Sequence, residues 1–186
     1  MTASLPATLL QLWSLTGRSP SHSAADWNHF FDPIGLILLA PAAKNNYWCT
    51  PLNSFTFAAT GGDGVHYGLV NTGSGFTDFS PVVMTVPMCD TPNLIVGANL
   101  KEFLSLGCRF GYFALEQLIY NRERTIRELA TGQFDPEQEE KERRLLKSIT
   151  EAFNLKPWAN PAARLEELAV AFTATLQLPE ASESAA

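Results

Sequence analysis

The stretch FTFAATGGDGVHYGLV, residues 55–70, carries the most informative local pattern in the chain. Apolar residues alternate with polar or small ones on both sides of its glycines: Phe55, Phe57, Val65, Tyr67 and Leu69. Such alternation is typical of strands that are buried on one face. Because glycine supplies the positive φ angles of a tight reversal, the stretch predicts an antiparallel hairpin that turns at Gly61 to Gly64.

The residues that follow extend this sheet. A second glycine-rich turn occupies residues 71–75 and leads through Phe76 to Phe79 into a run rich in β-branched residues, Val82 to Val86. The connections are too short to hold a crossover helix, so the sheet is expected to be an antiparallel meander.

Beyond the meander the sequence becomes helical. Asn99 and Glu102 match an N-terminal capping pattern, and the helix that they begin is expected to close at Gly107. Apolar residues from Phe113 to Leu129 predict one long helix that runs towards Gly132. The pairs Asp135-Pro136 and Asn160-Pro161 predict the starts of two further helices.

The N-terminal part is less regular. The spacing of the apolar residues predicts an amphipathic helix from Leu5 to Leu15. A Ser-rich loop at 19–23 and a short helix at 24–31 should follow. The run Ile34 to Ala40 fits a buried strand or a helix fragment, and Pro41 to Leu52 reads as a loop.

Together these patterns predict an α+β fold with a central antiparallel β-meander flanked by N-terminal and C-terminal helices. With 186 residues, of which 46% are hydrophobic, one domain over residues 1–178 and a flexible tail at 179–186 are expected. The apolar faces predict eight largely buried side chains: Phe57, Val65, Tyr67, Val83, Leu100, Phe103, Leu118 and Phe172.

Charge and apolar runs bear on the class of partner. A formal net charge of −6 argues against nucleic acid, which requires clustered Lys and Arg, and would favour association with a basic protein. No Lys or Arg precedes the first apolar residues, and the apolar run Ile34 to Ala43 is shorter than the roughly 18 residues that span a bilayer. A cytoplasmic protein without membrane contact is therefore expected.

The candidates for chemistry are few. Cys49, Cys89 and Cys108 are far apart and lack metal-ligand spacing, so they are expected to be buried free thiols, and no metal or cofactor is expected. Asp63 and His66 in the loop Thr60 to His66 could pair as orienter and general base. No nucleophile motif accompanies them, and hairpin geometry already explains the loop.

Two clusters of aromatic residues, Trp27 with Phe30 and Phe31, and Tyr47 with Trp48, are more often core than surface. An exposed aromatic patch beside acidic groups would instead suit a protein interface.

Three segments resemble a known family: Asn53 to Tyr67 (NSFTFAATGGDGVHY), Ser80 to Met84 (SPVVM) and Ile95 to Leu104 (IVGANLKEFL). They are similar to the core of the SUKH superfamily, the SMI1/KNR4-like proteins. In that family a strand ending in a Gly-Asp-Gly turn precedes a Pro-Val strand and a helix that begins near Asn-Leu-x-x-Phe-Leu. The resemblance covers residues 53 to about 120 and leaves a helical extension at 121–178.

The resemblance implies an α+β fold, no enzymatic role and, for many bacterial members, service as an immunity protein that neutralises a toxin by direct binding. The expected function is therefore a non-catalytic protein-binding module with a protein partner, which could be a basic toxin domain. Asp63, His66 and Asp78 are the residues expected to contact it. The alternative is a small-ligand binder or hydrolase that uses the Thr60 to His66 loop.

Overall fold

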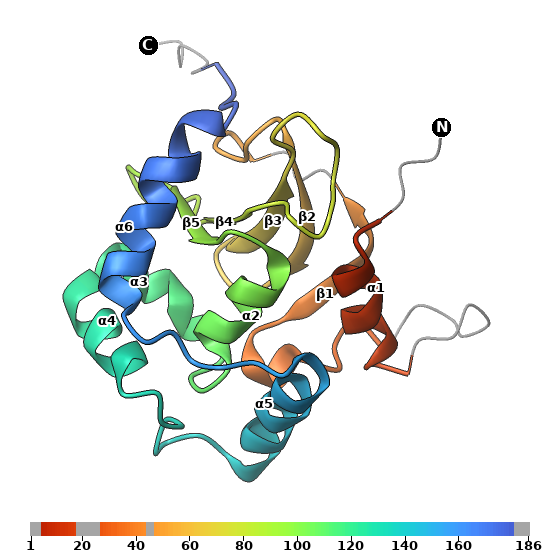
Figure 1. Ribbon diagram of the computed structural model, residues 1–186, viewed down its shortest axis with the longest axis vertical. Helices are drawn as coiled ribbons and strands as arrows, with labels where there is room; N and C mark the ends of the chain where they lie inside the picture. The colour runs from red at the N-terminus through yellow and green to blue at the C-terminus, as the bar shows by residue number, and fades with distance from the viewer. Residues whose placement is uncertain (1–4, 18–26, 44–46, 181–186) are drawn as a thin grey trace.

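The computed structural model describes residues 5–17, 27–43 and 47–180, and a five-stranded antiparallel sheet lies at its centre (Figure 1). The strands follow one another in chain order, and each pairs with the next. They are β1 (Ile37–Ala43), β2 (Ser54–Ala59), β3 (His66–Val70), β4 (Val82–Thr85) and β5 (Asn93–Gly97). The α+β class and the antiparallel meander predicted from the sequence are confirmed.

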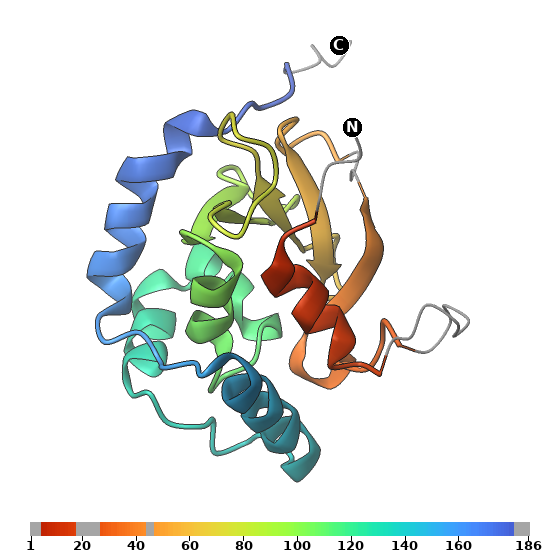
Figure 2. The same ribbon diagram turned by 45° about the vertical axis from the view of Figure 1, so that its right-hand side comes forward.

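Helices cover both faces of this sheet. They are α1 (Ala7–Ser14), α2 (Leu100–Gly107), α3 (Gln117–Tyr120), α4 (Arg122–Ala130), α5 (Glu140–Phe153) and α6 (Pro161–Phe172), with short 3₁₀ helices η1 (Asp32–Ile34), η2 (Phe113–Glu116) and η3 (Thr173–Thr175). The main core joins one face of the sheet to α1, α2 and α5. A smaller cluster of Val70, Val83 and Ile95 packs on the opposite face against Leu168 of α6. In Figure 2, α6 accordingly runs along the side of the molecule away from α1. In the described ranges no helix has the length and apolar character needed to cross a membrane.

The β2–β3 hairpin forms as its sequence predicts. Its reversal contains three residues with positive φ, namely Gly61 at 85°, Asp63 at 45° and Gly64 at 73°. Glycine adopts this region at little cost, whereas an L-residue such as Asp63 is uncommon there. The turn therefore has a defined shape at one end of the sheet.

Aromatic residues organise the main core. The ring of Phe103 lies 4.7 Å from that of Tyr67 and 5.2 Å from that of Tyr112, centroid to centroid. The Tyr67 hydroxyl donates to the Tyr112 carbonyl, and the Tyr112 hydroxyl donates to the Leu104 carbonyl at 2.9 Å. Each buried hydroxyl is thus satisfied. Of the eight side chains predicted to be buried, seven are at most 1% exposed. Phe172 is only half-buried, because it lies at the end of α6 over the smaller cluster.

Two predicted helices have different bounds in the structure. The prediction of one long helix from Phe113 to Leu129 is wrong. The segment divides into η2, α3 and α4, and the non-helical backbone of Asn121 (φ −142°, ψ 48°) separates α3 from α4. The helix expected at Asp135 begins only at Glu140, since the Asp135 carboxylate accepts the Glu137 N–H (2.9 Å) and closes a turn. Glu139 caps α5 instead.

The N-terminal half also departs from expectation. Residues 27–30 form turns rather than the end of the expected helix. The 3₁₀ helix η1 begins at Asp32, just after the point where that helix was expected to stop. Strand β1 runs through Pro41, inside the expected loop. Since β1 is an edge strand, the missing N–H of proline is tolerated. The expected Ser-rich loop and most of the tail lie outside the described residues.

Candidate functional site

Asp78 lies beside the N-terminus of α1. Its carboxylate accepts the backbone N–H groups of Ala7 (3.2 Å) and Thr8 (2.8 Å), while Pro6 at the cap position offers no side-chain acceptor. Partial desolvation tends to raise the pKa of Asp78, but the hydrogen bonds from Thr8 and Ala7 outweigh it, so the pKa is lowered. Asp78 is therefore a cap supplied by a distant segment, and its partner-binding role stays a prediction.

His66 is buried, with 1% of its surface exposed. Nδ1 lies 2.7 Å from the Gly64 carbonyl oxygen, and Nε2 lies 3.1 Å from Oγ1 of Thr50. Because a carbonyl can only accept, Nδ1 carries the proton and the neutral ring accepts the Thr50 hydroxyl at Nε2. Burial lowers the pKa of His66, which the hydrogen bond to Gly64 partly opposes. The Tyr47 ring stacks on the imidazole at 5.5 Å.

These contacts give His66 a positioning role. Its ring holds the hairpin turn to the segment Tyr47 to Thr50, and the side chain of Asn93 in β5 donates to the Cys49 carbonyl (2.9 Å) in the same segment. Both ring nitrogens are thus engaged inside the protein, and a partner-binding role for His66 stays a prediction. Neither Asp63 nor His66 lines the cleft of about 260 Å³ that lies between η2 and the start of α5.

Asp63 is exposed at the tip of the turn, close enough to Glu116 of η2 and Tyr120 of α3 for its charge to act on both. Desolvation and then the charge of Asp63 raise the pKa of Glu116. Desolvation, followed by the charges of Cys89, Glu116 and Asp63, raises the pKa of Tyr120. Of the three predicted contact residues, Asp63 is thus the one whose surroundings resemble a binding surface.

Exposed aromatic residues surround this turn. A Cβ atom at Gly64 would lie 2.7 Å from the Tyr47 ring, and one at Gly62 would lie 3.7 Å from the Phe113 ring. We call this end of the sheet the hairpin-end surface. It comprises Tyr47, Trp48, Met88, Phe113 and Tyr120, which are 43%, 64%, 77%, 54% and 50% exposed, together with Asp63, Asp90 and Glu116.

The backbone fixes Phe113 in this surface. A Cβ atom at Gly35 would lie 2.2 Å from the backbone nitrogen of Phe113, so only glycine allows η1 and η2 to pack this closely. The neighbouring N–H of Tyr112 donates to the Ile34 carbonyl at 2.7 Å. The exposed ring therefore projects from a rigid support.

Basic residues are missing from the segments that form the hairpin-end surface. The sequence has no Lys or Arg in residues 47–49, 60–65, 86–92 and 113–120. Within the described residues that define it, the surface therefore combines apolar contact area with negative charge only. Eleven large apolar side chains are exposed in the described part of the chain, and five of them lie on this surface.

Sequence reasoning missed most of this surface. Aromatic pairs such as Tyr47 and Trp48 are more often core than surface, and Phe113 is predicted to begin a long helix, but all three side chains are exposed. In the other aromatic cluster, Trp27 and Phe31 are buried, whereas Phe30 is 44% exposed.

The three cysteines are free and differ in burial. Cys49 and Cys108 are buried free thiols, as predicted, and burial raises the pKa of each. Cys89 is also free but only half-buried, so the prediction is wrong for its burial. Within residues 5–17, 27–43 and 47–180, no group of three or more His, Cys, Asp or Glu could hold a metal ion.

Comparison with protein-family models, with curated proteins and with solved structures gives no match to this chain. The resemblance to the SUKH superfamily therefore stays a prediction.

Proposed function

We propose that the chain is a non-catalytic protein-binding module, and that its hairpin-end surface binds a basic protein partner. The observation that carries the proposal is the composition of this surface, which joins exposed aromatic rings to Asp63, Asp90 and Glu116 without a single Lys or Arg. In its specific form, suggested by the resemblance, the module is an immunity protein that neutralises a basic toxin domain.

The aromatic residues would supply most of the binding free energy. Tyrosine and tryptophan bury a large area with few rotatable bonds, and both are enriched among residues that dominate interfaces. Tyr47, the neighbour of Trp48, approaches the hairpin turn at Gly64, and Phe113 approaches it at Gly62, so a partner that covers the turn would contact both segments. A domain of this size can offer the roughly 800 Å² that a standard interface buries on each partner.

The carboxylates would select the partner. Complementary charge raises the association rate and penalises wrong partners more than it adds affinity. Asp63 and Glu116 are close enough for the charge of one to raise the pKa of the other. A cation from the partner would relieve that repulsion, which an acidic partner would increase.

The hairpin turn in this surface is also held by local contacts before binding. The turn is fixed by its positive φ angles, by the Gly64–His66 hydrogen bond and by the Thr50–His66 hydrogen bond. Since ordering loops at an interface costs free energy, this preorganisation favours stoichiometric binding.

Affinity capture from the source cells tests the proposal with a matched pair of variants, Trp48→Ala and Phe79→Ala. Both side chains are exposed (64% and 85%), and Phe79 lies outside the hairpin-end surface. A basic protein should be captured by the wild type and by Phe79→Ala. Trp48→Ala should weaken its binding by about 30-fold, as loss of a dominant aromatic residue does. Capture that Trp48→Ala leaves unchanged, or that both variants weaken equally, would contradict the proposal.

A further inference from the structure

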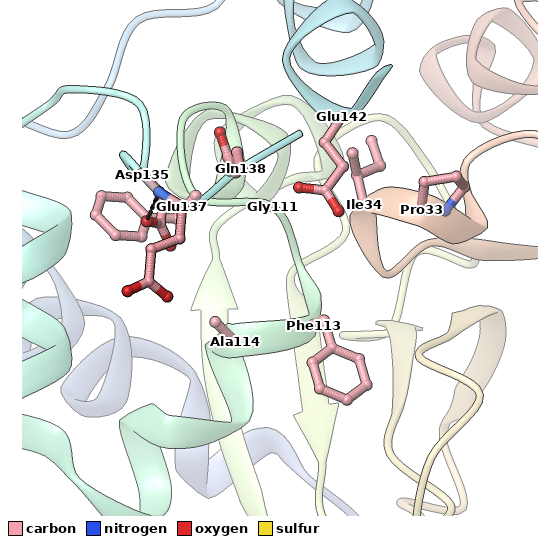
Figure 3. Close-up of a pocket in the computed structure, with 10 residues that line it drawn as sticks. Pro33, Ile34, Gly111, Phe113, Ala114, Asp135, Glu137, Gln138 and Glu142 are labelled. Atoms are coloured by element: carbon pink, nitrogen blue, oxygen red, sulfur yellow. Dashed lines mark hydrogen bonds between the residues drawn. The ribbon is translucent and has the colours of Figure 1, made fainter. Parts of the chain in front are cut away.

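A cleft of about 260 Å³ opens next to the hairpin-end surface, with Phe113 in its wall (Figure 3). Its upper lip in the figure is the turn before α5 together with the first turn of that helix, and its lower lip is η2. The lining residues are Pro33, Ile34, Phe110, Gly111, Phe113, Ala114, Asp135, Glu137, Gln138 and Glu142.

The two lips differ in chemistry. Glu137 and Glu142 extend from the upper lip towards η2, where Ala114 and Phe113 make the lower lip apolar and the Phe113 ring points away from the upper lip (Figure 3). Pro33, Ile34 and Gly111 continue the apolar wall. The cleft thus joins an apolar surface to a carboxylate edge, and no Lys or Arg lines it.

The carboxylates have acceptor capacity to spare. Asp135 uses Oδ1 for the Glu137 N–H, and Glu142 uses Oε2 for the Glu139 N–H. The carboxylate of Glu137 forms no hydrogen bond or ion pair within the described residues, although its charge contributes to raising the pKa of Arg124 after the larger effects of Glu128. Cations on the neighbouring segments make other contacts: Arg124 binds Glu128 at 2.8 Å, Arg109 lies over the Phe134 ring at 4.6 Å, and Arg143 donates to the Pro136 carbonyl at 3.1 Å, although its buried Nε has no hydrogen-bond partner in the described residues.

Gln138 adds an unsatisfied acceptor. Its amide nitrogen donates to the Arg109 carbonyl at 3.0 Å, but its buried Oε1 accepts no hydrogen bond from the described residues. A buried acceptor without a donor is costly, so this lip carries an unmet demand for an N–H group.

We propose that this cleft receives an arginine side chain of the protein partner. The aliphatic stem of arginine would lie along Ile34 and Phe113, and its planar guanidinium would donate to the carboxylates of the upper lip. Arginine fits better than lysine because its fixed fork of five N–H donors can serve several acceptors at once. The inference rests on the proposed function, since the cleft and the hairpin-end surface share Phe113.

The test needs no identified partner. The ¹⁵N-labelled chain is titrated with N-acetyl-arginine amide, and N-acetyl-citrulline amide, which has nearly the same shape without the charge, serves as the control. The arginine compound should shift the backbone amide signals of Gly111, Ala114 and Gln138 and saturate at about millimolar concentration, as expected for one side chain. The citrulline compound should leave them unchanged.

Two variants locate the effect. Glu137→Gln removes one exposed carboxylate from the lip and should weaken arginine binding by about threefold, the usual scale for one exposed ion pair. Glu166→Gln, on the exposed face of α6, should have no effect. Equal shifts with citrulline, or arginine shifts that spread to α6 and ignore Glu137→Gln, would overturn the inference.

Failure of this inference can be told apart from failure of the proposed function. If the affinity of a captured partner is reduced by Trp48→Ala but not by Glu137→Lys, the arginine site is refuted and the proposed binding function is supported. If the cleft binds arginine specifically but no partner depends on Trp48, arginine recognition by the cleft is supported and the proposed function of the hairpin-end surface is refuted.

Discussion

Replacing Asp78 should destabilise the fold through α1, which begins more than seventy residues away in the chain. Asp78→Ala removes the acceptor for two backbone N–H groups at a helix end that Pro6 cannot cap. Loss of such a cap costs about 1 kcal/mol, and loss of the negative charge at the helix N-terminus adds about 0.5 kcal/mol. The expected decrease in the free energy of unfolding is therefore about 1–2 kcal/mol at pH 7.

Urea denaturation at low ionic strength measures this decrease. The variant Asp78→Asn separates the contribution of the charge from that of the hydrogen bonds. Asparagine keeps an acceptor oxygen but not the charge, so it should lose only about 0.5 kcal/mol. Glu166→Gln serves as a surface control and should stay within about 0.5 kcal/mol of the wild type.

The pH dependence gives a second test of Asp78. Its pKa is lower in the folded chain than in the unfolded chain, so its stabilisation is complete above the unfolded pKa of about 3.9 and is lost as the pH falls through the folded pKa. The difference between wild type and Asp78→Asn should shrink below about pH 4. An Asp78→Ala variant as stable as the wild type would refute the capping argument and return Asp78 to the candidate contact residues.

Four further outcomes are expected. Phe103→Ala should lower the free energy of unfolding by about 3–5 kcal/mol in urea denaturation, because it leaves a cavity among aromatic rings, and a change within error would mean that the ring is not in the core. Gly64→Ala should cost at least about 1 kcal/mol, since φ is positive and the new Cβ would meet Tyr47; an unchanged urea midpoint would contradict this turn geometry. Burial lowers the pKa of His66, so the unfolded chain takes up a proton at a higher pH than the folded chain does, and stability should decrease as the pH falls from about 6.5 towards 5. A flat stability profile in that range would argue against a buried, neutral imidazole. A screen with ester, amide and phosphate-ester substrates should show no turnover, and turnover that disappears in folded Asp63→Ala or His66→Ala would overturn the non-catalytic assignment.

Local sequence was sufficient where neighbours in the chain determine the structure. The β2–β3 hairpin follows from alternating residues and positive-φ glycines, and the Asn99 side chain accepts the Glu102 N–H (2.9 Å) as the capping pattern predicts. In a capping box the Glu102 side chain would accept the N–H of Asn99. Here its carboxylate instead accepts the Ala98 N–H at 2.6 Å and also binds Arg164 at 2.7 Å. Strand β5 was not predicted, because the short run Asn93–Gly97 has no clear alternation and is specified by pairing with β4.

Sequence was insufficient where distant segments meet. Nothing near Asp78 indicates that it caps α1, and nothing near Phe113 indicates that η1 supports it while leaving its ring exposed. The exposure of Tyr47 and Trp48 likewise depends on the hydrogen bonds that anchor their segment to His66 and Asn93. The candidate surface is therefore a tertiary property, and Asp63 was the one predicted contact residue found in it.

Site-specific photo-crosslinking tests the central claim most directly. A benzophenone amino acid replaces Phe113 in the hairpin-end surface or, in a second preparation, Phe79, which is even more exposed but lies outside that surface. Irradiation of the tagged chains in the source cells should join one basic protein to the chain through position 113 and none through position 79. No crosslink at position 113, or the same crosslinked proteins at both positions, would contradict a partner-binding role for this surface.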